Sequence, residues 1–132
     1  MLDTRRTVLV IDDDADFAAL VASMIESPHC RAVVATDGFA GLSLAQALCP
    51  SLILCDLSMP DFGGDEIMRK LQADPEMAHV PRVLLSGYGC PDLRTVPANA
   101  FIGKPFNVEF LRRLVDGFTR PQEVRLVDSS AA

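Results

Sequence analysis

The chain has 132 residues, of which 49% are hydrophobic and 23% are charged, with 9 prolines, 8 glycines and no tryptophan. This length and composition are typical of one soluble domain with one core and exclude a second sizeable domain. The formal net charge of −6 is opposite in sign to the basic surfaces of nucleic-acid-binding proteins. We therefore expect no direct contact with DNA or RNA.

The sequence also lacks the signals of a membrane or secreted protein. The first residues carry charge where a signal peptide has an apolar segment, and no apolar run reaches the length of a membrane span. The four cysteines (Cys30, Cys49, Cys55 and Cys90) show no C-x-x-C spacing, so we interpret them as reduced structural residues. We expect a cytoplasmic protein that makes no membrane contact.

Apolar strands and amphipathic helices alternate along the chain. Residues 7–11 are apolar on both faces, as in a central parallel strand covered by helices on both sides. Apolar residues then recur at helical spacing over residues 17–25, before Pro28. The same reasoning predicts strands at 31–35, 52–55, 83–85 and 100–102, and helices at 39–48, 65–73 and, after Asn107, 110–118.

This order predicts a flavodoxin-like α/β fold: a doubly wound, five-stranded parallel sheet with strand order 2-1-3-4-5 between two helix layers. The connection after the fourth strand holds only residues 91–96, between glycines and Pro97, so we expect a short or irregular fourth helix. We place the domain at residues 1–119. Residue 121 is a proline and the last four residues are small, so we expect residues 120–132 to form a loose tail.

Polar residues stand where the predicted strands end. In such a sheet the carboxyl ends of the strands share one edge, where ligands bind. Asp12 and Asp13 follow the first strand, Asp56 the third, Ser86 the fourth and Lys104 the fifth. Clustered carboxylates repel one another unless a cation lies between them, and Mg²⁺ prefers such oxygen ligands. With a lysine and a hydroxyl nearby, the set suits formation of an aspartyl phosphate.

Four short motifs resemble the receiver domains of two-component response regulators. They are VLVIDD at 8–13, DLSMP at 56–60 with the glycines at 63 and 64, LSG at 85–87 and GKPF at 103–106. The resemblance implies that Asp56 accepts a phosphoryl group from a histidine of a kinase or phosphotransfer protein. It further implies that Asp13 and Asp56 bind Mg²⁺, with Asp12 acting through a water molecule and Ser58 through its backbone carbonyl.

The resemblance also implies a conformational switch. Lys104 would contact the phosphoryl oxygens, Ser86 would be the switch hydroxyl and Phe101 the switch aromatic. The Lys104–Pro105 peptide bond would be cis. Movement of Ser86 and Phe101 would repack the surface around strand 100–102, where a downstream protein would dock. The segment from Ser86 to Lys104 is about one helical turn short for this family, and it loses the regular fourth helix that forms part of the usual docking face.

The resulting hypothesis is a stand-alone receiver domain, monomeric or weakly dimeric, that catalyses only its own phosphorylation and dephosphorylation and is not a conventional enzyme. Three alternatives remain. The domain could be a binding module that is never phosphorylated, or a fragment of a larger regulator or hybrid kinase. It could also be a phosphatase of the haloacid-dehalogenase type, because IDDD at 11–14 contains a D-x-D motif with Asp12 as nucleophile and Asp14 as acid and base.

Overall fold

The computed structural model describes residues 3–60, 62–87, 92 and 94–119. The described chain alternates strands with helices. The strands are β1 (Arg6–Ile11), β2 (Cys30–Ala35), β3 (Leu52–Asp56), β4 (Arg82–Ser86) and β5 (Ala100–Gly103). The helices are α1 (Ala15–Ile25), α2 (Gly38–Leu48), α3 (Gly64–Ala73) and α4 (Val108–Thr119). Every predicted strand is present with its ends displaced by at most one residue, and the predicted α/β class is confirmed.

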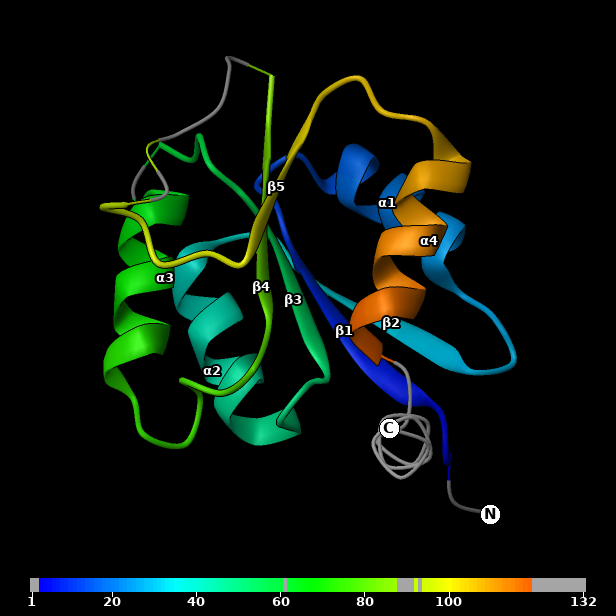
Figure 1. Ribbon diagram of the computed structural model, residues 1–132, viewed down its shortest axis with the longest axis horizontal. Helices are drawn as coiled ribbons and strands as arrows, with labels where there is room; N and C mark the ends of the chain where they lie inside the picture. Colours follow the sequence, from blue (N-terminus) through cyan, green and yellow to red (C-terminus); the bar gives the residue numbers. More distant parts are fainter. Residues whose placement is uncertain (1–2, 61, 88–91, 93, 120–132) are drawn as a thin grey trace, which may run out of the picture.

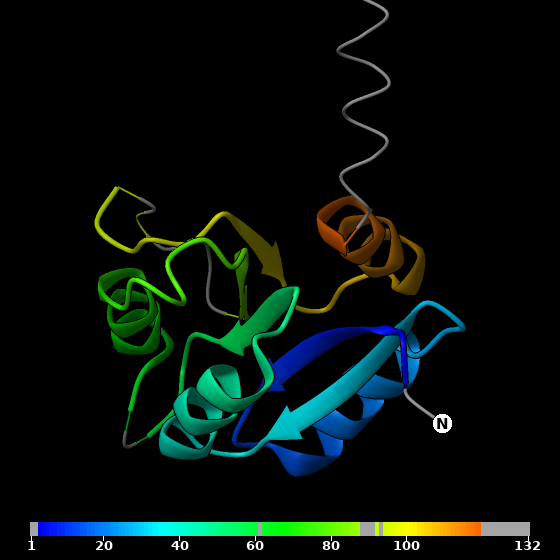
Figure 2. The ribbon, with the colours of Figure 1, turned by 90° about the horizontal axis from the view of Figure 1, so that it is seen from below.

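All neighbouring strands pair in parallel, in the order β2-β1-β3-β4-β5. Helices α2 and α3 cover one face of the sheet, and α1 and α4 cover the other (Figure 1). Figure 2 shows the twisted sheet between the two helix layers. The predicted three-layer fold and strand order are therefore confirmed, and the carboxyl ends of the strands share one edge.

Residues of β1 alternate between two separate cores, because successive side chains of a strand point to opposite faces. Leu9 and Ile11 belong to the core under α2 and α3. Val8 and Val10 belong to the core under α1 and α4. All four are fully buried. This two-sided burial is why the strand lacks the polar alternation of a solvent-facing sheet, and it holds the end of β1 rigidly at the edge of the sheet.

The start of α3 requires a glycine because it lies against the backbone that follows β3. A Cβ atom at Gly64 would overlap the carbonyl oxygen of Asp56 and lie 2.8 Å from Cα of Leu57. The amide of Gly64 also donates to the carbonyl of Leu57 at 3.0 Å. This close approach fixes the loop after Asp56 against α3.

No helix forms among the described residues between β4 and β5, which are 87, 92 and 94–99. A single turn is present instead: the amides of Thr95 and Val96 donate to the carbonyl of Asp92 at 3.0 and 3.1 Å. Val96 is buried in the core under α2 and α3. The described part of the predicted 91–96 helix is thus irregular, as expected, while residues 91 and 93, like the predicted tail at 120–132, lie outside the described residues.

A buried arginine organises this irregular connection. The guanidinium of Arg82 donates to the carbonyls of Pro97 at 2.9 Å and of Ala78 and Val80 at 3.1 Å, and to the side-chain oxygen of Gln72. No carboxylate among the described residues pairs with it, and burial lowers the pKa of the guanidinium. The side chain therefore ties the end of α3 to the segment that leads into β5.

Replacing Arg82 with lysine should destabilise the fold. Lysine keeps the charge but lacks the planar fork, so several buried carbonyls lose their donor, and we expect a loss of about 2–3 kcal/mol in the free energy of unfolding. The exposed Arg69→Lys, which alters only a surface ion pair with Asp65, should change it by less than about 0.5 kcal/mol. Urea unfolding measures both, and an equal effect of the two substitutions would contradict a structural role for Arg82.

Candidate functional site

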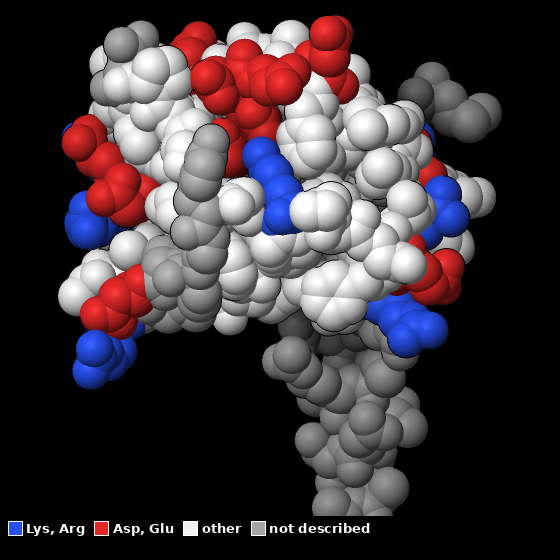
Figure 3. All heavy atoms as spheres, turned by 90° about the horizontal axis from the view of Figure 1, so that it is seen from above, with Lys and Arg blue, Asp and Glu red and all other residues white. Residues whose placement is uncertain are grey.

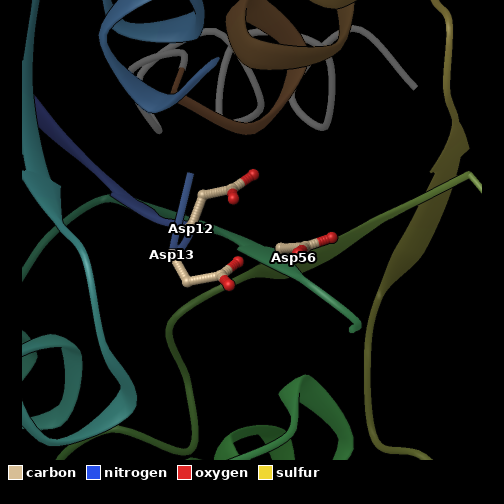
Figure 4. A group of neighbouring side chains, drawn as sticks. All are labelled: Asp12, Asp13 and Asp56. Atoms are coloured by element: carbon tan, nitrogen blue, oxygen red, sulfur yellow. The ribbon is translucent and has the colours of Figure 1, made fainter. Parts of the chain in front are cut away.

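Three carboxylates meet where β1 and β3 end. Asp12 and Asp13 directly follow β1, and Asp56 is the last residue of β3, which pairs with β1. One carboxylate oxygen from each lies within 4.8 Å of the others, and Figure 4 shows the three side chains close together at the ends of the two strands. Asp12 is 1% exposed and Asp56 6% exposed, whereas Asp13 is open to solvent. The predicted convergence of these three side chains is therefore present.

A lysine from the end of β5 reaches the same point. The ammonium nitrogen of Lys104 lies 3.1 Å from Oδ1 of Asp56 and 3.4 Å from Oδ2 of Asp12. Its backbone amide donates to the carbonyl of Ser86 at 2.7 Å, which anchors Lys104 to the end of β4. One ammonium thus contacts two of the three carboxylates, and the site retains an excess of negative charge.

A cleft of about 450 Å³ is lined by Asp12, Asp13, Asp56 and Lys104. Asp14, Ser58 and Gly87 complete its lining. Figure 3 looks onto this edge of the molecule and shows acidic side chains gathered beside a basic one. The cleft is therefore open to solvent and large enough to admit a small anionic group between the carboxylates and the ammonium.

The remaining predicted residues surround the cleft without lining it. Ser86 is the last residue of β4 and is 1% exposed, next to Gly87 in the lining. Phe101 lies in β5, half-buried against the core under α2 and α3. Pro105 follows Lys104 through a cis peptide bond, as the sequence predicted. These three residues therefore belong to β4, β5 and the segment after β5, and they lie outside the lining of the cleft.

Burial makes ionisation of Asp12 costly. Desolvation raises the pKa of its carboxyl, and the negative charge of Asp56 raises it further. The amide of Asp14, which donates to Oδ1 of Asp12 at 3.0 Å, and the ammonium of Lys104 oppose this increase. Burial likewise raises the pKa of the Cys55 thiol, so the residue beside Asp56 stays protonated and unreactive. Among the described cysteines all three are free; Cys30 and Cys55 are buried and Cys49 is exposed.

The sequence did not identify one neighbour of Lys104. The ring of Phe17, in the first turn of α1, has its centroid 4.3 Å from the ammonium nitrogen. The helical spacing of apolar residues explains Phe17 as a core residue, and nothing in that spacing distinguishes it from the rest of the stripe. Only its position in the turn after the aspartates could have indicated a place at the cleft.

Comparison with known proteins identifies the family. The family model for the response regulator receiver domain matches residues 8–116, which include every charged residue of the cleft. The chain belongs to this family. Receiver domains are signalling domains and not conventional enzymes, so the family match favours the receiver hypothesis over the phosphatase alternative.

The receiver relatives occur in two settings. A hybrid signal transduction histidine kinase D of Dictyostelium discoideum is 31% identical over 114 residues, covering 83% of this chain and 7% of that protein. Protein Rrf1 of Nitratidesulfovibrio vulgaris is 29% identical over 109 residues, covering 83% of this chain and 79% of that protein. The chain therefore spans a small part of the kinase and most of the short protein.

Solved structures share the fold. The chemotaxis protein CheY4 of Vibrio cholerae has a TM-score of 0.80 at 24% identity, covering 86% of this chain and 98% of that one. The receiver domain of the Pseudomonas aeruginosa sensor histidine kinase PA1611, solved with a magnesium ion in its active-site cleft, has a TM-score of 0.80 at 21% identity. It covers 89% of this chain and 99% of that one. Within the described residues, no helix is both long enough and apolar enough to span a bilayer.

Replacing Asp12 with asparagine should stabilise the metal-free domain at neutral pH, because the neutral amide avoids the cost of a buried charge beside Asp56. A carboxyl with a raised pKa binds its proton more tightly in the folded state, so wild-type stability falls as the pH rises from the ordinary value of 3.8 through the raised one. The gain from Asp12→Asn should therefore be present at neutral pH and shrink toward pH 3.8.

Urea unfolding in the presence of a chelator, from about pH 7 down to about pH 4, measures this difference. The exposed Asp116→Asn serves as the control for removing a carboxylate away from the cleft. An Asp12→Asn protein that is less stable than wild type at neutral pH would contradict the account of the buried charge.

Proposed function

We propose that this receiver domain accepts a phosphoryl group on Asp56 from a phosphorylated histidine of a kinase or phosphotransfer protein. The observation that carries the proposal is the pairing of Asp56 with an ammonium 3.1 Å away, inside a cleft that is also lined by the carboxylates of Asp12, Asp13 and Asp14. A carboxylate nucleophile needs positive charge near the oxygens of the incoming phosphoryl group, and Lys104 supplies it.

The transfer exchanges one bond to phosphorus for another. A carboxylate oxygen of Asp56 forms a bond to phosphorus while the bond from phosphorus to the histidine nitrogen breaks, and its electron pair stays on the imidazole. Lys104 shifts from pairing with the carboxylates to pairing with the phosphoryl oxygens. Since Asp56 is a strand end held between β1 and β4, its carboxylate is presented to the donor with little loss of freedom.

The donor set fits Mg²⁺. The carboxylates of Asp12, Asp13 and Asp56 supply hard oxygen ligands, their ligand atoms lie within 4.8 Å of one another, and one ammonium leaves them undercompensated. With the backbone carbonyl of Ser58, which lines the same cleft, these residues would hold the ion. When bound, Mg²⁺ neutralises negative charge on the carboxylates and on the phosphoryl oxygens. The receiver domain of PA1611, with magnesium in its active-site cleft, supports this assignment.

Phosphorylation would then act through Ser86 and Phe101. A phosphoryl group adds about −1.5 to −2 charges and three acceptor oxygens next to the buried end of β4. We propose that the hydroxyl of Ser86 turns toward these oxygens and that Phe101, on the neighbouring β5, repacks in response. The surface formed by β5 and the irregular connection before it would change shape, and a downstream protein would distinguish the two states.

The proposal includes a cytoplasmic domain that is monomeric or weakly dimeric. Because the matched relatives include both a hybrid kinase and the short Rrf1, the same chemistry serves a domain that acts alone and one that belongs to a larger regulator or hybrid kinase. A receiver fold used only for binding, without phosphorylation, is the competing function. It requires neither the lysine nor the metal-ligand set that this cleft contains.

Incubation with Mg²⁺ and acetyl phosphate should add one phosphoryl group per chain, seen as an increase in intact mass. The increase should be absent in Asp56→Asn, which lacks the nucleophile, and absent when a chelator removes the metal. The exposed Asp116→Asn should be labelled like wild type.

An unchanged mass of the wild-type protein, together with no binding of beryllofluoride, would contradict the proposal and favour the binding module. Labelling that persists in Asp56→Asn would place the nucleophile at another residue.

A further inference from the structure

The ammonium of Lys104 is enclosed by three side chains. Two are the carboxylates of Asp56 and Asp12, at 3.1 and 3.4 Å, and the third is the ring of Phe17, with its centroid at 4.3 Å. The Lys104 side chain is 23% exposed, so much of its surface is already removed from water. A cation above an aromatic face is attracted by the ring quadrupole, more strongly where water is excluded.

The ring of Phe17 is itself held from two directions. The backbone amide of Phe17 donates to Oδ1 of Asp14 at 3.0 Å, and the amide of Asp14 donates to Oδ1 of Asp12 at the same distance. On the other side, its ring meets the ring of Phe106 edge to face, with centroids 6.0 Å apart and planes at 71°. The ring is therefore fixed by the segment that carries Asp12 and by the segment that carries Lys104.

We propose that Phe17 is a positioning residue that holds the ammonium of Lys104 at the acceptor carboxylate through its ring face. A lysine side chain has a flexible four-carbon stem, and in a cleft open to solvent its ammonium has other positions available. The ring makes the position beside Asp56 the favoured one. This inference rests on the proposed function, because it assigns to Phe17 the orientation of the cation that receives the phosphoryl oxygens.

Two substitutions separate the ring face from simple packing. Phe17→Leu keeps an apolar side chain against the same core but removes the quadrupole, whereas Phe17→Tyr keeps the ring. Phe118→Leu is the matched control, because Phe118 packs against the same core under α1 and α4 and lines a different pocket. A purely structural role for Phe17 predicts similar effects of the two leucine substitutions.

The first measurement follows Lys104 directly and needs no phosphorylation. The chain has two lysines, Lys70 and Lys104, so the signals of their ε-methylene groups are readily assigned by NMR. In Phe17→Leu, the Lys104 signal should lose its ring-current shift and its order parameter should fall, and Phe17→Tyr should restore both. Lys70, which lies over the ring of Phe62, is the internal control and should not change.

The second measurement is the rate of labelling by acetyl phosphate at saturating Mg²⁺, as a function of donor concentration. Phe17→Leu should lower the maximal rate by about three- to tenfold, the range expected for loss of one cation–π contact. Phe17→Tyr should recover most of that loss, and Phe118→Leu should stay within about twofold of wild type.

The outcomes separate the two proposals. An unchanged order parameter of Lys104 in Phe17→Leu would overturn the inference, and so would a labelled wild type whose rate is the same in Phe17→Leu. Equal impairment in Phe17→Tyr and Phe17→Leu would also overturn it. A wild type that is not labelled at all would instead contradict the proposed function, while the NMR result would still decide whether Phe17 positions Lys104.

Discussion

The arrangement of this protein depends on the repulsion among three carboxylates held at one edge of a sheet. Asp12 and Asp56 are nearly inaccessible to solvent, so water screens their charges poorly, and a single ammonium compensates them only in part. Such a site therefore favours the binding of cations. A phosphoryl group is itself negatively charged, so it can enter only together with compensating positive charge. Affinity for a divalent cation and the capacity to accept a phosphoryl group thus have one physical origin.

The fold supplies this arrangement through topology and not through local sequence. The residues of the cleft are separated by up to 92 positions along the chain, as Asp12 and Lys104 are, yet parallel pairing brings all the strand ends to one edge. Burial of β1 and β3 on both faces fixes those ends, and the close approach of Gly64 fixes the loop that follows Asp56. The carboxylates cannot move apart without disturbing two cores.

The sequence was sufficient to predict those elements that leave a recognisable pattern among neighbouring residues. Apolar runs predicted the strands, and an aspartate or lysine at the end of a run predicted a residue of the cleft. Two features could not be predicted from such local patterns. Arg82 looks like an ordinary charged residue before a strand, and only the folded chain shows the carbonyls that surround its guanidinium. Phe17 belongs to an apolar stripe, and its contact with Lys104 depends on how α1 packs against the end of β5.

The most direct test of the account is the effect of Mg²⁺ on the free energy of unfolding, compared with K⁺ at equal ionic strength. If the three carboxylates form one site, Mg²⁺ should stabilise the wild-type protein increasingly as its concentration exceeds the dissociation constant. The stabilisation should nearly vanish in Asp13→Asn, whose exposed side chain contributes little to the core. Equal stabilisation of both proteins by Mg²⁺, or none in either, would contradict the existence of a shared site.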